Sequence, residues 1–474
     1  MRGFRKPAIA RNLVGLLAII FVTSCAEGFK DDETFTGGVT NAQLEAVPAD
    51  DLVITKNATA TQAIVTWPVV YGAGGYEVTV YNVDDADNPT VVGAWDKKFV
   101  DGSTCSFAIA DDSKYKVVHQ VLGNAKLNNK AAAAATQVPF TTLLPAVIIP
   151  GGADLTAWFT QYRLDTVDVA HEKAFELEEG ARYTLSGDVD LLRVNLTLRG
   201  NKVNRPTVVM TGGFRSRGGG SIFKYIRFEC EGLTSSMFYG FNDIPQGAPM
   251  KSDACLVTNP VTFKACTFEK LPKPLFHDNG KAYAVESFTV TDCLVELTDN
   301  GFFYRNTASK GAVKDFLIEN STVYKNNAGT DYFMQLSGQR FTGLWTTASQ
   351  SYVNCTFYRF DRMHNSNGYS VAGMSVNVKK CIFLDFLRDG AARYILPGGN
   401  VNNKILTFAG NTYWRNGQPD PGNGNYDKSQ TELAQDPLCA APAEGDFTVG
   451  NPATIEQGIG DPRWLPAAEP QTSF

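Results

Sequence analysis

Residues 261–268 read Val-Thr-Phe-Lys-Ala-Cys-Thr-Phe, and they open a series of six copies of one pattern, apolar-x-x-small-x-apolar. The copies are Phe263-x-x-Cys266-x-Phe268, Val290-x-x-Cys293-x-Val295, Ile318-x-x-Ser321-x-Val323, Tyr352-x-x-Cys355-x-Phe357, Val378-x-x-Cys381-x-Phe383 and Phe408-x-x-Asn411-x-Tyr413. Such repeats indicate a solenoid, in which each unit buries its apolar face only by stacking on its neighbours. Each copy alternates with the period of a strand, and polar segments link the copies. The sequence therefore predicts an all-β protein with a right-handed parallel β-helix.

Four cysteines, Cys266, Cys293, Cys355 and Cys381, occupy the small position of the repeat. Stacked coils are about 4.8 Å apart, which is farther than the roughly 3.8 Å between Cβ atoms that a disulfide prefers. Ser321 occupies the same position in another coil. We therefore predict a column of buried thiols and no disulfide framework.

The N-terminus has the pattern of a targeting signal. Four basic residues (Arg2, Arg5, Lys6 and Arg11) precede a short apolar run at residues 13–22. Ten apolar residues are too few for a permanent membrane-spanning helix. The stretch Thr23-Ser24-Cys25 resembles a bacterial lipobox, which implies a signal peptide at residues 1–24 and lipidation of Cys25.

Lys30-Asp31-Asp32-Glu33 follows the lipobox and resembles the surface-export signal of Bacteroidetes lipoproteins. The alternative is a solvated charge run in a tether. We expect a lipid-anchored outer-membrane protein that faces the cell exterior. The formal charge is −6, and removal of the four basic residues of the signal gives −6 − 4 = −10. This balance argues against nucleic acid as a partner, because nucleic acid requires a basic face.

Composition divides the rest of the chain. Residues 25–46 form the lipidated cysteine and a flexible tether, and residues 47–142 contain short strands separated by Gly and Asp clusters. Trp67 on one strand and Tyr76 on the next resemble a fibronectin type III module, in which both would pack the core. Residues 143–153 form a Pro-stiffened linker. Residues 154–474 form the β-helix, with a C-terminal cap and Trp464 packed on the end.

An amphipathic helix is predicted at the start of the β-helix. Leu155, Trp158, Phe159 and Tyr162 follow the spacing i, i+3, i+4, i+7, and Asp154 is placed to cap. This helix would cover the open end of the solenoid, which otherwise exposes an unpaired edge.

Two rows of residues are candidate ligand sites. The first is an outward column in a second strand of each coil: Tyr239, His277, Tyr304 with Arg305, Met334, His364 and Leu396. The second is an aromatic residue followed by a cation after the repeat strand: Tyr324-Lys325, Tyr358-Arg359 and Trp414-Arg415. Aromatic faces stack on sugar rings, and arginine forks match carboxylates. The alternatives are ordinary surface residues of a sheet for the first row, and turn residues whose aromatic stems cover the sheet for the second.

Catalytic signatures are absent. The polygalacturonase motifs and the Trp-Ile-Asp-His motif of one pectate lyase family do not occur, and every Asp-Asp pair precedes the solenoid. We predict no cofactor. Calcium is the one alternative, because Asp278, Asp361, Asp385 and Asp389 could bind it, although they do not fall in one column. No cysteine spacing resembles a zinc site.

The whole chain, ending in Gly460-Asp461-Pro462-Arg463-Trp464, resembles a Bacteroidetes outer-membrane lipoprotein family of unknown function. Its members resemble β-helix proteins, similar to pectate lyases in fold, that belong to polysaccharide-utilisation loci often related to pectin. The resemblance implies a surface lipoprotein that binds an acidic plant polysaccharide and works with an outer-membrane glycan transporter. The alternatives are a polysaccharide lyase or hydrolase acting on pectic glycans, and a scaffold component without a sugar site.

Overall fold

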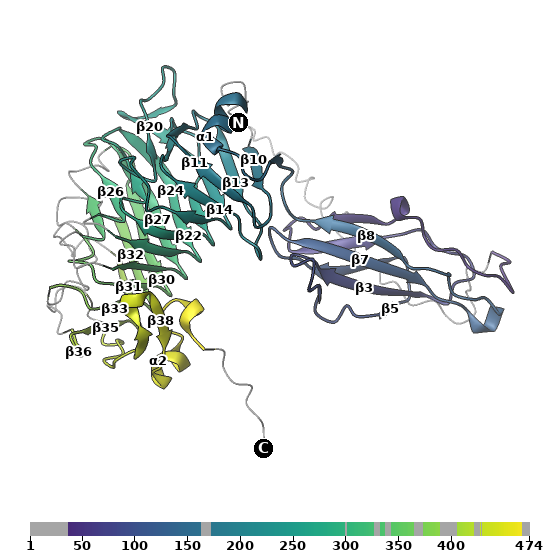
Figure 1. Cartoon of the computed structure of the whole chain (residues 1–474). Helices are drawn as coiled ribbons and strands as arrows, with labels where there is room; N and C mark the ends of the chain where they lie inside the picture. The colour runs from purple at the N-terminus through teal and green to yellow at the C-terminus, as the bar shows by residue number, and fades with distance from the viewer. Residues whose placement is uncertain are drawn as a thin grey trace, which may run out of the picture. The chain divides into compact units, whose positions relative to one another are not determined.

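A computed structural model describes residues 37–162, 172–298, 301–326, 332–336, 343–364, 373–388, 405–420, 427 and 429–466 (Figure 1). The chain divides into two compact units, Met1–Leu144 and Pro145–Phe474. Cys25 and the whole targeting segment lie outside the described residues. Neither of the two α-helices found in the described ranges is long and apolar enough to cross a membrane.

The first unit contains two antiparallel sheets. One has the order β1-β2-β6, and the other has the order β4-β3-β7-β8 with β5 also paired to β3. The strands are β1 (Val53–Lys56), β2 (Gln62–Thr66), β3 (Tyr76–Asn82), β4 (Thr90–Val91), β5 (Lys98–Val100), β6 (Thr104–Ala108), β7 (Lys114–Val121) and β8 (Thr136–Thr141), with 3-10 turns η1 (Ala49–Asp51) and η2 (Ala125–Leu127). Burial alternates strictly along β7, as expected for a strand with one face on a core. The unit is therefore an all-β arrangement, and its assignment as a fibronectin type III module stays a prediction.

Aromatic side chains fill the core of this unit. Trp67 and Tyr76 meet edge to face with ring centroids 5.3 Å apart, and both are buried. His119 is fully buried with its ring 4.6 Å from that of Trp67. Burial lowers the pKa of His119 to about 4, so its imidazole is neutral at pH 7. The structural role predicted for Trp67 and Tyr76 is confirmed.

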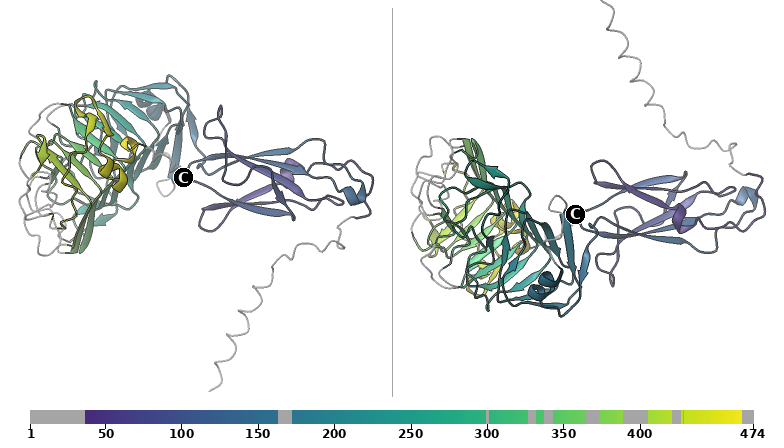
Figure 2. Two further views of the ribbon diagram at one scale, coloured as in Figure 1. Left: turned by 90° about the horizontal axis from the view of Figure 1, so that it is seen from below. Right: turned by 90° about the horizontal axis from the view of Figure 1, so that it is seen from above.

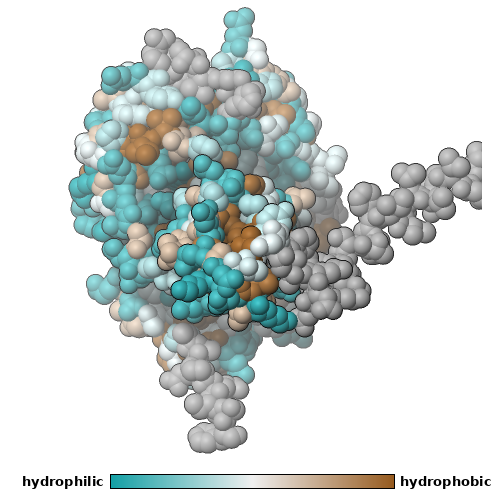
Figure 3. Space-filling view, turned by 90° about the vertical axis from the view of Figure 1, so that its right-hand side faces the viewer, coloured by the Kyte–Doolittle hydropathy of each residue, from teal (hydrophilic) through white to brown (hydrophobic). Residues whose placement is uncertain are grey.

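On the side of the molecule seen in Figure 3, hydrophilic residues predominate and hydrophobic ones form small separate patches.

The second unit is a parallel β-helix made of three sheets, which confirms the all-β solenoid. The first sheet contains β9 (Val147–Ile149), β10 (Glu172–Leu177), β13 (Asn195–Arg199), β16 (Ser221–Lys224), β21 (Val261–Lys264), β24 (Tyr283–Thr291), β27 (Ala312–Glu319), β30 (Thr347–Val353), β32 (Gly373–Lys379) and β34 (Ile405–Ala409), with β19 (Met250–Lys251) and β20 (Ala254–Val257) beside β24. The second sheet contains β11 (Arg182–Leu185), β14 (Thr207–Met210), β17 (Arg227–Glu229), β22 (Thr267–Leu271), β25 (Leu294–Leu297), β28 (Thr322–Lys325), β31 (Thr356–Tyr358), β33 (Ile382–Leu384), β35 (Thr412–Arg415) and β36 (Gln418–Pro419). The third sheet contains β12 (Val189–Asp190), β15 (Phe214–Ser216), β18 (Tyr239–Phe241), β23 (Phe276–His277), β26 (Tyr304–Asn306) and β29 (Met334–Leu336).

Coils follow one another along the β-helix in the order of the sequence, as the colours in Figures 1 and 2 show. Equivalent residues of neighbouring coils stack inside it: Phe223 lies on Phe263 with centroids 5.2 Å apart, and Phe228 lies on Phe268 at the same distance. One continuous apolar core runs from Ile149 to Tyr413. Stacking of this kind is what the repeat in the sequence predicts.

The repeat pattern marks the corner between the first and second sheets. The residue just before the small position has positive φ, from 48° at Asn320 to 60° at Gly410, so one left-handed residue turns the chain. The side chain at the small position then accepts a hydrogen bond from the backbone N–H of the preceding coil. Cys293 N–H donates to Ser321 Oγ at 3.0 Å, and Cys266 N–H donates to Cys293 Sγ at 3.4 Å. The cysteines of the column are buried and free, as predicted.

Helix α1 (Leu155–Tyr162) packs against the first coil through Leu155 and Phe159, which are buried. Asp154 Oδ1 accepts a hydrogen bond from Thr156 N–H at 2.8 Å, so the predicted helix and its cap are confirmed. Part of the predicted linker is a strand, because β9 pairs in parallel with β10 and adds an edge to the first sheet.

The C-terminal segment lies across the outer face of the second sheet. It contains β37 (Cys439–Ala441), η6 (Pro442–Glu444), β38 (Asp446–Val449), α2 (Pro452–Gln457) and η7 (Pro462–Trp464). Its residues Phe447, Val449 and Ile459 share an apolar cluster with side chains of β28, β31 and β33. The prediction that Trp464 packs on the end of the solenoid is wrong, because Trp464 Nε1 donates to Thr322 Oγ1 on the side of the sheet at 2.8 Å.

Candidate functional site

Four residues of the predicted outward column, among them Met334, point into the core, and Leu396 of that column lies outside the described residues. Tyr239 and Tyr304 are fully buried, and each pairs in register with Phe276, which is also buried. His364 is fully buried and bridges to Met334 in the same inward column. The predicted register is wrong because the strands of the third sheet are only two or three residues long. Phe303, just before β26, already faces inward, so alternation fails at the bend between Phe303 and Tyr304.

These buried polar groups have partners inside the β-helix. Tyr239 OH donates to Ser221 Oγ at 3.1 Å, and burial raises the pKa of Tyr239 to about 12. His364 Nε2 lies 2.9 Å from Gln350 Nε2, and burial lowers the pKa of His364 to about 3. His364 is therefore a neutral core residue and does not belong to a surface site.

The second predicted row is covered by the C-terminal segment. The ring of Tyr358 lies 5.6 Å from that of Phe447, which leaves Tyr358 only 6% exposed, and Trp414 packs against the same cluster. Arg359 NH1 donates to Asn326 O at 3.4 Å, and Arg415 Nε donates to Phe386 O at 2.6 Å. The aromatic rings therefore contact the C-terminal segment, and the prediction of an open ligand surface is wrong for Tyr358, whereas Arg359, Trp414 and Arg415 stay partly exposed.

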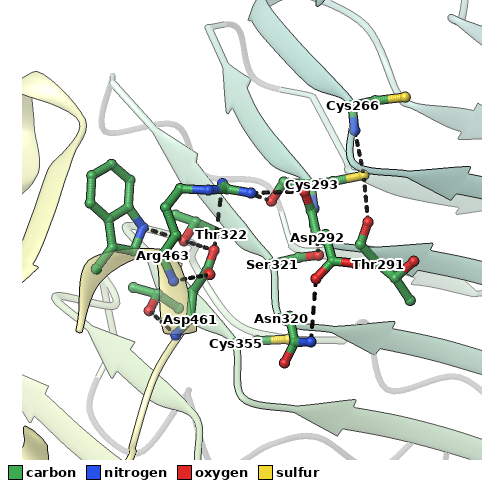
Figure 4. A network of polar contacts seen from close by, with 12 residues as sticks. Cys266, Thr291, Asp292, Cys293, Asn320, Ser321, Thr322, Cys355, Asp461 and Arg463 are labelled. Atoms are coloured by element: carbon green, nitrogen blue, oxygen red, sulfur yellow. Dashed lines mark hydrogen bonds and ion pairs between the residues drawn. The ribbon is translucent and has the colours of Figure 1, made fainter. Parts of the chain in front are cut away.

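A polar network fixes the last residues of this segment. We call residues 460–464 the C-terminal clasp (Figure 4). Asp461 accepts a hydrogen bond from Thr322 Oγ1 at 2.8 Å, and its own N–H donates to Thr356 Oγ1 at 3.2 Å. Arg463 reaches further along the sheet and donates to the carbonyl of Asp292 at 2.8 Å. The clasp thus spans several coils, which gives the Gly-Asp-Pro-Arg-Trp ending a structural role.

The third sheet carries a polar and aromatic row on its outer face. In register, Arg215, Gly240, His277, Arg305 and Gln335 follow one another across β15, β18, β23, β26 and β29. Tyr304, Met334 and His364 of the inward column are in register. The residues two positions before them in the chain form a second row, Phe302, Tyr332 and Arg362. We call the part formed by His277, Phe302, Arg305, Tyr332, Gln335 and Arg362 the outer strip. All six residues are partly exposed.

A cation lies over an aromatic ring on consecutive coils of the outer strip. The guanidinium of Arg305 lies 5.7 Å from the ring centroid of Phe302, and that of Arg362 lies 4.8 Å from the ring centroid of Tyr332. The rings of Phe302 and Tyr332 are 6.3 Å apart. Asp361 is buried and pairs with Arg362 at 3.5 Å and with Arg388 at 2.6 Å. The strip therefore repeats one arrangement, a flat ring and a guanidinium, at the spacing of a coil.

His277 is held as a neutral imidazole at one end of the strip. Thr307 Oγ1 donates to Asp278 Oδ1 at 2.9 Å, so it can only accept from His277 Nε2, which lies 3.3 Å away. Burial lowers the pKa of His277 to about 4; nearby Arg305 and Arg215 lower it further, while Asp278 opposes this. His277 therefore carries no charge at pH 7, and its proton sits on Nε2.

Arg215 closes the other end of the row. Its guanidinium is buried, pairs with Asp188 at 3.1 Å and donates to Phe214 O at 2.8 Å. Burial lowers its pKa, and Asp188 opposes that shift. Beside it, a Cβ placed on Gly240 would lie 2.2 Å from Met237 Sδ, so Met237 covers this part of the sheet. Arg217 pairs with Asp190 at 2.6 Å. Arg215 and Arg217 therefore form structural ion pairs.

The carboxylates considered for calcium have other partners. Asp278 accepts hydrogen bonds from the backbone N–H groups of Thr307 and Ala308 at 2.8 Å each, and Asp385 accepts one from Asn416 N–H at 3.0 Å. Asp389 lies outside the described residues. In the described ranges, no group of three His, Cys, Asp or Glu side chains is arranged to hold a metal ion.

His277 and Arg305 lie on the outer face, as predicted. Phe302, Tyr332 and Arg362 were not among the predicted site residues. A signal was present in the aromatic runs Phe302-Phe303-Tyr304 and Tyr332-Phe333, because a filled core has limited room for consecutive rings and Phe303 and Tyr304 already occupy it.

Three family models match successive parts of the chain, and all three describe domains of unknown function. DUF4992 matches residues 7–186, DUF4957 matches residues 181–326 and DUF5123 matches residues 316–464. The last two models therefore divide one continuous β-helix between them. The comparison with curated proteins found no match.

Among solved structures, the chain is similar to the catalytic unit of a thermostable GH87 alpha-1,3-glucanase from Streptomyces thermodiastaticus strain HF3-3. The similarity covers 74% of this chain and 89% of that chain, with 10% sequence identity and a TM-score of 0.20.

Proposed function

We propose that this protein is a surface lipoprotein that binds a polysaccharide along the outer strip of its β-helix. The observation that carries the proposal is the repeated pairing of ring and guanidinium, Phe302 with Arg305 and Tyr332 with Arg362, on neighbouring coils. A sugar ring stacks on an aromatic face, and its hydroxyls bond to planar polar groups. Coils repeat about every 4.8 Å, so a polymer laid along the β-helix would meet the same chemistry more than once.

Exposure supports this choice of face. On the second sheet the outward aromatic residues of the later coils are covered by the C-terminal segment, and on the earlier coils Arg182 and Arg227 pair with Glu229 and Glu269. Phe302, Tyr332 and both their arginines remain partly exposed. Partly exposed rings held by neighbouring cations are rigid, so they lose little conformational entropy when a ligand binds.

The test is affinity electrophoresis of a soluble form that begins at residue 26, in gels containing pectic or neutral polysaccharides. We expect retardation by at least one polysaccharide, and we expect Phe302→Ala with Tyr332→Ala to abolish it. Phe99→Ala is the matched control, because Phe99 is an aromatic residue of the first unit that is 57% exposed. The proposal fails if no polysaccharide retards the protein, or if the control variant loses as much binding as the double variant.

Product analysis of the same mixtures separates binding from catalysis. A binding protein leaves the polymer length unchanged. A lyase would release chains with an unsaturated uronate, which absorbs ultraviolet light, and a hydrolase would release new reducing ends. Either product would replace the binding proposal with an enzymatic one.

The proposed location follows from the N-terminal pattern. We propose that Cys25 is lipidated, that the protein faces the exterior from the outer membrane, and that the first unit acts as a fibronectin type III-like spacer. Its proposed partner is an outer-membrane glycan transporter. Cys25→Ala should abolish incorporation of labelled fatty acid, and protease added to whole cells should remove the wild-type protein. Labelling that persists in the variant would refute the anchor.

A further inference from the structure

Arg305 differs from the other charged residues of the third sheet in its partner. Its Nε donates to the neutral amide oxygen of Gln335 at 2.5 Å, and its guanidinium stacks over Phe302. Across the described residues, no carboxylate lies within ion-pair distance of Arg305. By contrast, two buried arginines of the β-helix pair with acids: Arg199 with Glu176 at 2.6 Å and Arg215 with Asp188 at 3.1 Å.

Among the described residues, the neighbours of Arg305 do not compensate its charge. Its two register partners, His277 and Gln335, are both neutral. Asp278, whose N–H donates to the carbonyl of Arg305 at 3.1 Å, uses Oδ2 to accept from the N–H groups of Thr307 and Ala308. Its Oδ1 accepts from the N–H of Gly280 and from Thr307 Oγ1. A partly buried cation without a counter-ion is costly unless an anion completes it. The positive field also acts on His277, whose pKa Arg305 lowers.

The guanidinium is also oriented for a planar anion. Gln335 accepts a hydrogen bond from Nε, and the ring of Phe302 lies against one face of the guanidinium. Neither of these two contacts uses the edge that carries the two Nη groups. Two parallel N–H groups on that edge match the two oxygens of a carboxylate. A lysine in the same place would supply only a point charge.

Resting on the proposed function, we propose that Arg305, positioned by Gln335 and Phe302, is a subsite for the carboxylate of a uronic acid unit. The polysaccharide of the outer strip is then a polyuronate with free carboxyl groups. Tyr332, one coil further along, would stack on an adjoining sugar ring. Esterification of the carboxyl group removes its charge and one acceptor oxygen, and would therefore weaken binding.

The test compares four polymers by affinity electrophoresis: polygalacturonate, the same polymer fully methyl-esterified, a neutral galactan and a sulfated galactan. We expect the wild type to bind polygalacturonate most tightly. Arg305→Ala should weaken that binding about tenfold to a hundredfold, the usual loss for a charge-assisted pair, and should weaken binding of the methyl ester much less. Arg305→Lys should lose most of the same binding, because it keeps the charge but not the fork.

Gln335→Glu is the most specific variant. It would place a carboxylate on Arg305 with almost no change of shape, so the preference for polygalacturonate over its ester should disappear. Arg227→Ala is the matched control. It removes the same charge from the second sheet, where Arg227 pairs with Glu269 at 2.7 Å, and should change nothing.

The outcomes separate this inference from the proposed function. Equal binding of acid and ester by the wild type, or an equal effect of Arg305→Ala and Arg227→Ala, overturns the subsite while glycan binding stands. Sulfated galactan bound as tightly as polygalacturonate, with the same loss in Arg305→Ala, overturns carboxylate recognition in favour of general anion binding. Failure of all four polymers to bind refutes the proposed function itself, and the subsite with it.

Discussion

Replacement of Asp461 by alanine should open the C-terminal clasp. The carboxylate is buried and accepts hydrogen bonds from Thr322 Oγ1 at 2.8 Å and from Arg463 N–H at 3.0 Å. Each hydrogen bond to a charged group contributes about 1.5–3 kcal/mol. The desolvation of the carboxylate, which raises its pKa, offsets part of this sum. We therefore expect Asp461→Ala to cost about 2–4 kcal/mol in the free energy of opening the clasp.

A loss near the middle of this range, about 3 kcal/mol, raises the open population roughly 100-fold, because each 1.4 kcal/mol is a factor of ten. Hydrogen exchange followed by mass spectrometry measures this population locally. Peptides covering residues 446–464 should lose protection, whereas peptides from β24 should not change. Asp461→Asn should lose less, because it keeps an acceptor and removes the desolvated charge.

The raised pKa of Asp461 also determines how its contribution to folding stability changes with pH. The folded pKa of Asp461 lies above the unfolded value, so the stability that its protonation contributes is present at low pH and is lost as pH rises through the folded pKa. Glu456→Ala is the control, because it removes an exposed acid from α2 in the same segment. The reasoning is refuted if Asp461→Ala exchanges like the wild type, or if β24 loses as much protection as the clasp.

Three further perturbations test the fold and the strip. Ser321→Ala leaves the buried N–H of Cys293 without an acceptor and should cost about 1–3 kcal/mol in chemical denaturation, whereas Ser321→Cys should cost less, because cysteine fills this column in neighbouring coils. His119 is neutral in the folded protein, so the first unit should lose stability as pH falls from about 6.5 to about 4, by roughly 2 kcal/mol at pH 5. His119→Phe should remove this pH dependence, which circular dichroism measures across a pH titration. Gly240→Ala would place a Cβ 2.2 Å from His277 O, so it should separate β18 from β23. We expect it to cost about 1–3 kcal/mol in the free energy of unfolding and to weaken glycan binding by displacing His277. Unchanged melting and binding would contradict the packing described.

The repeat made the architecture predictable. Contacts within one coil and with the next coil determine its apolar positions, its small residue and its polar links. The spacing of these residues in the sequence therefore predicts the stacked coils. The same holds for α1, where an amphipathic period and Asp154 define a local structure. Several predicted side-chain directions were wrong in the third sheet, because its strands of two or three residues are too short to show an alternating pattern. In the third sheet, two inward residues in succession, Phe303 and Tyr304, break the alternation that placed Tyr304 outside.

The sequence by itself therefore determined that this protein is a stacked β structure with a free thiol column, because those features rest on local and nearest-neighbour contacts. The tertiary structure alone decided which outward residues remain open. Tyr324 and Tyr358 have the composition of a sugar platform, yet a segment that returns from far along the chain covers them. Bonds such as that between Thr322 and Asp461, 139 residues apart, hold this segment in place. The spacing of residues along the chain does not encode such long-range packing. The candidate site is therefore left on the outer strip, whose six residues stay partly exposed.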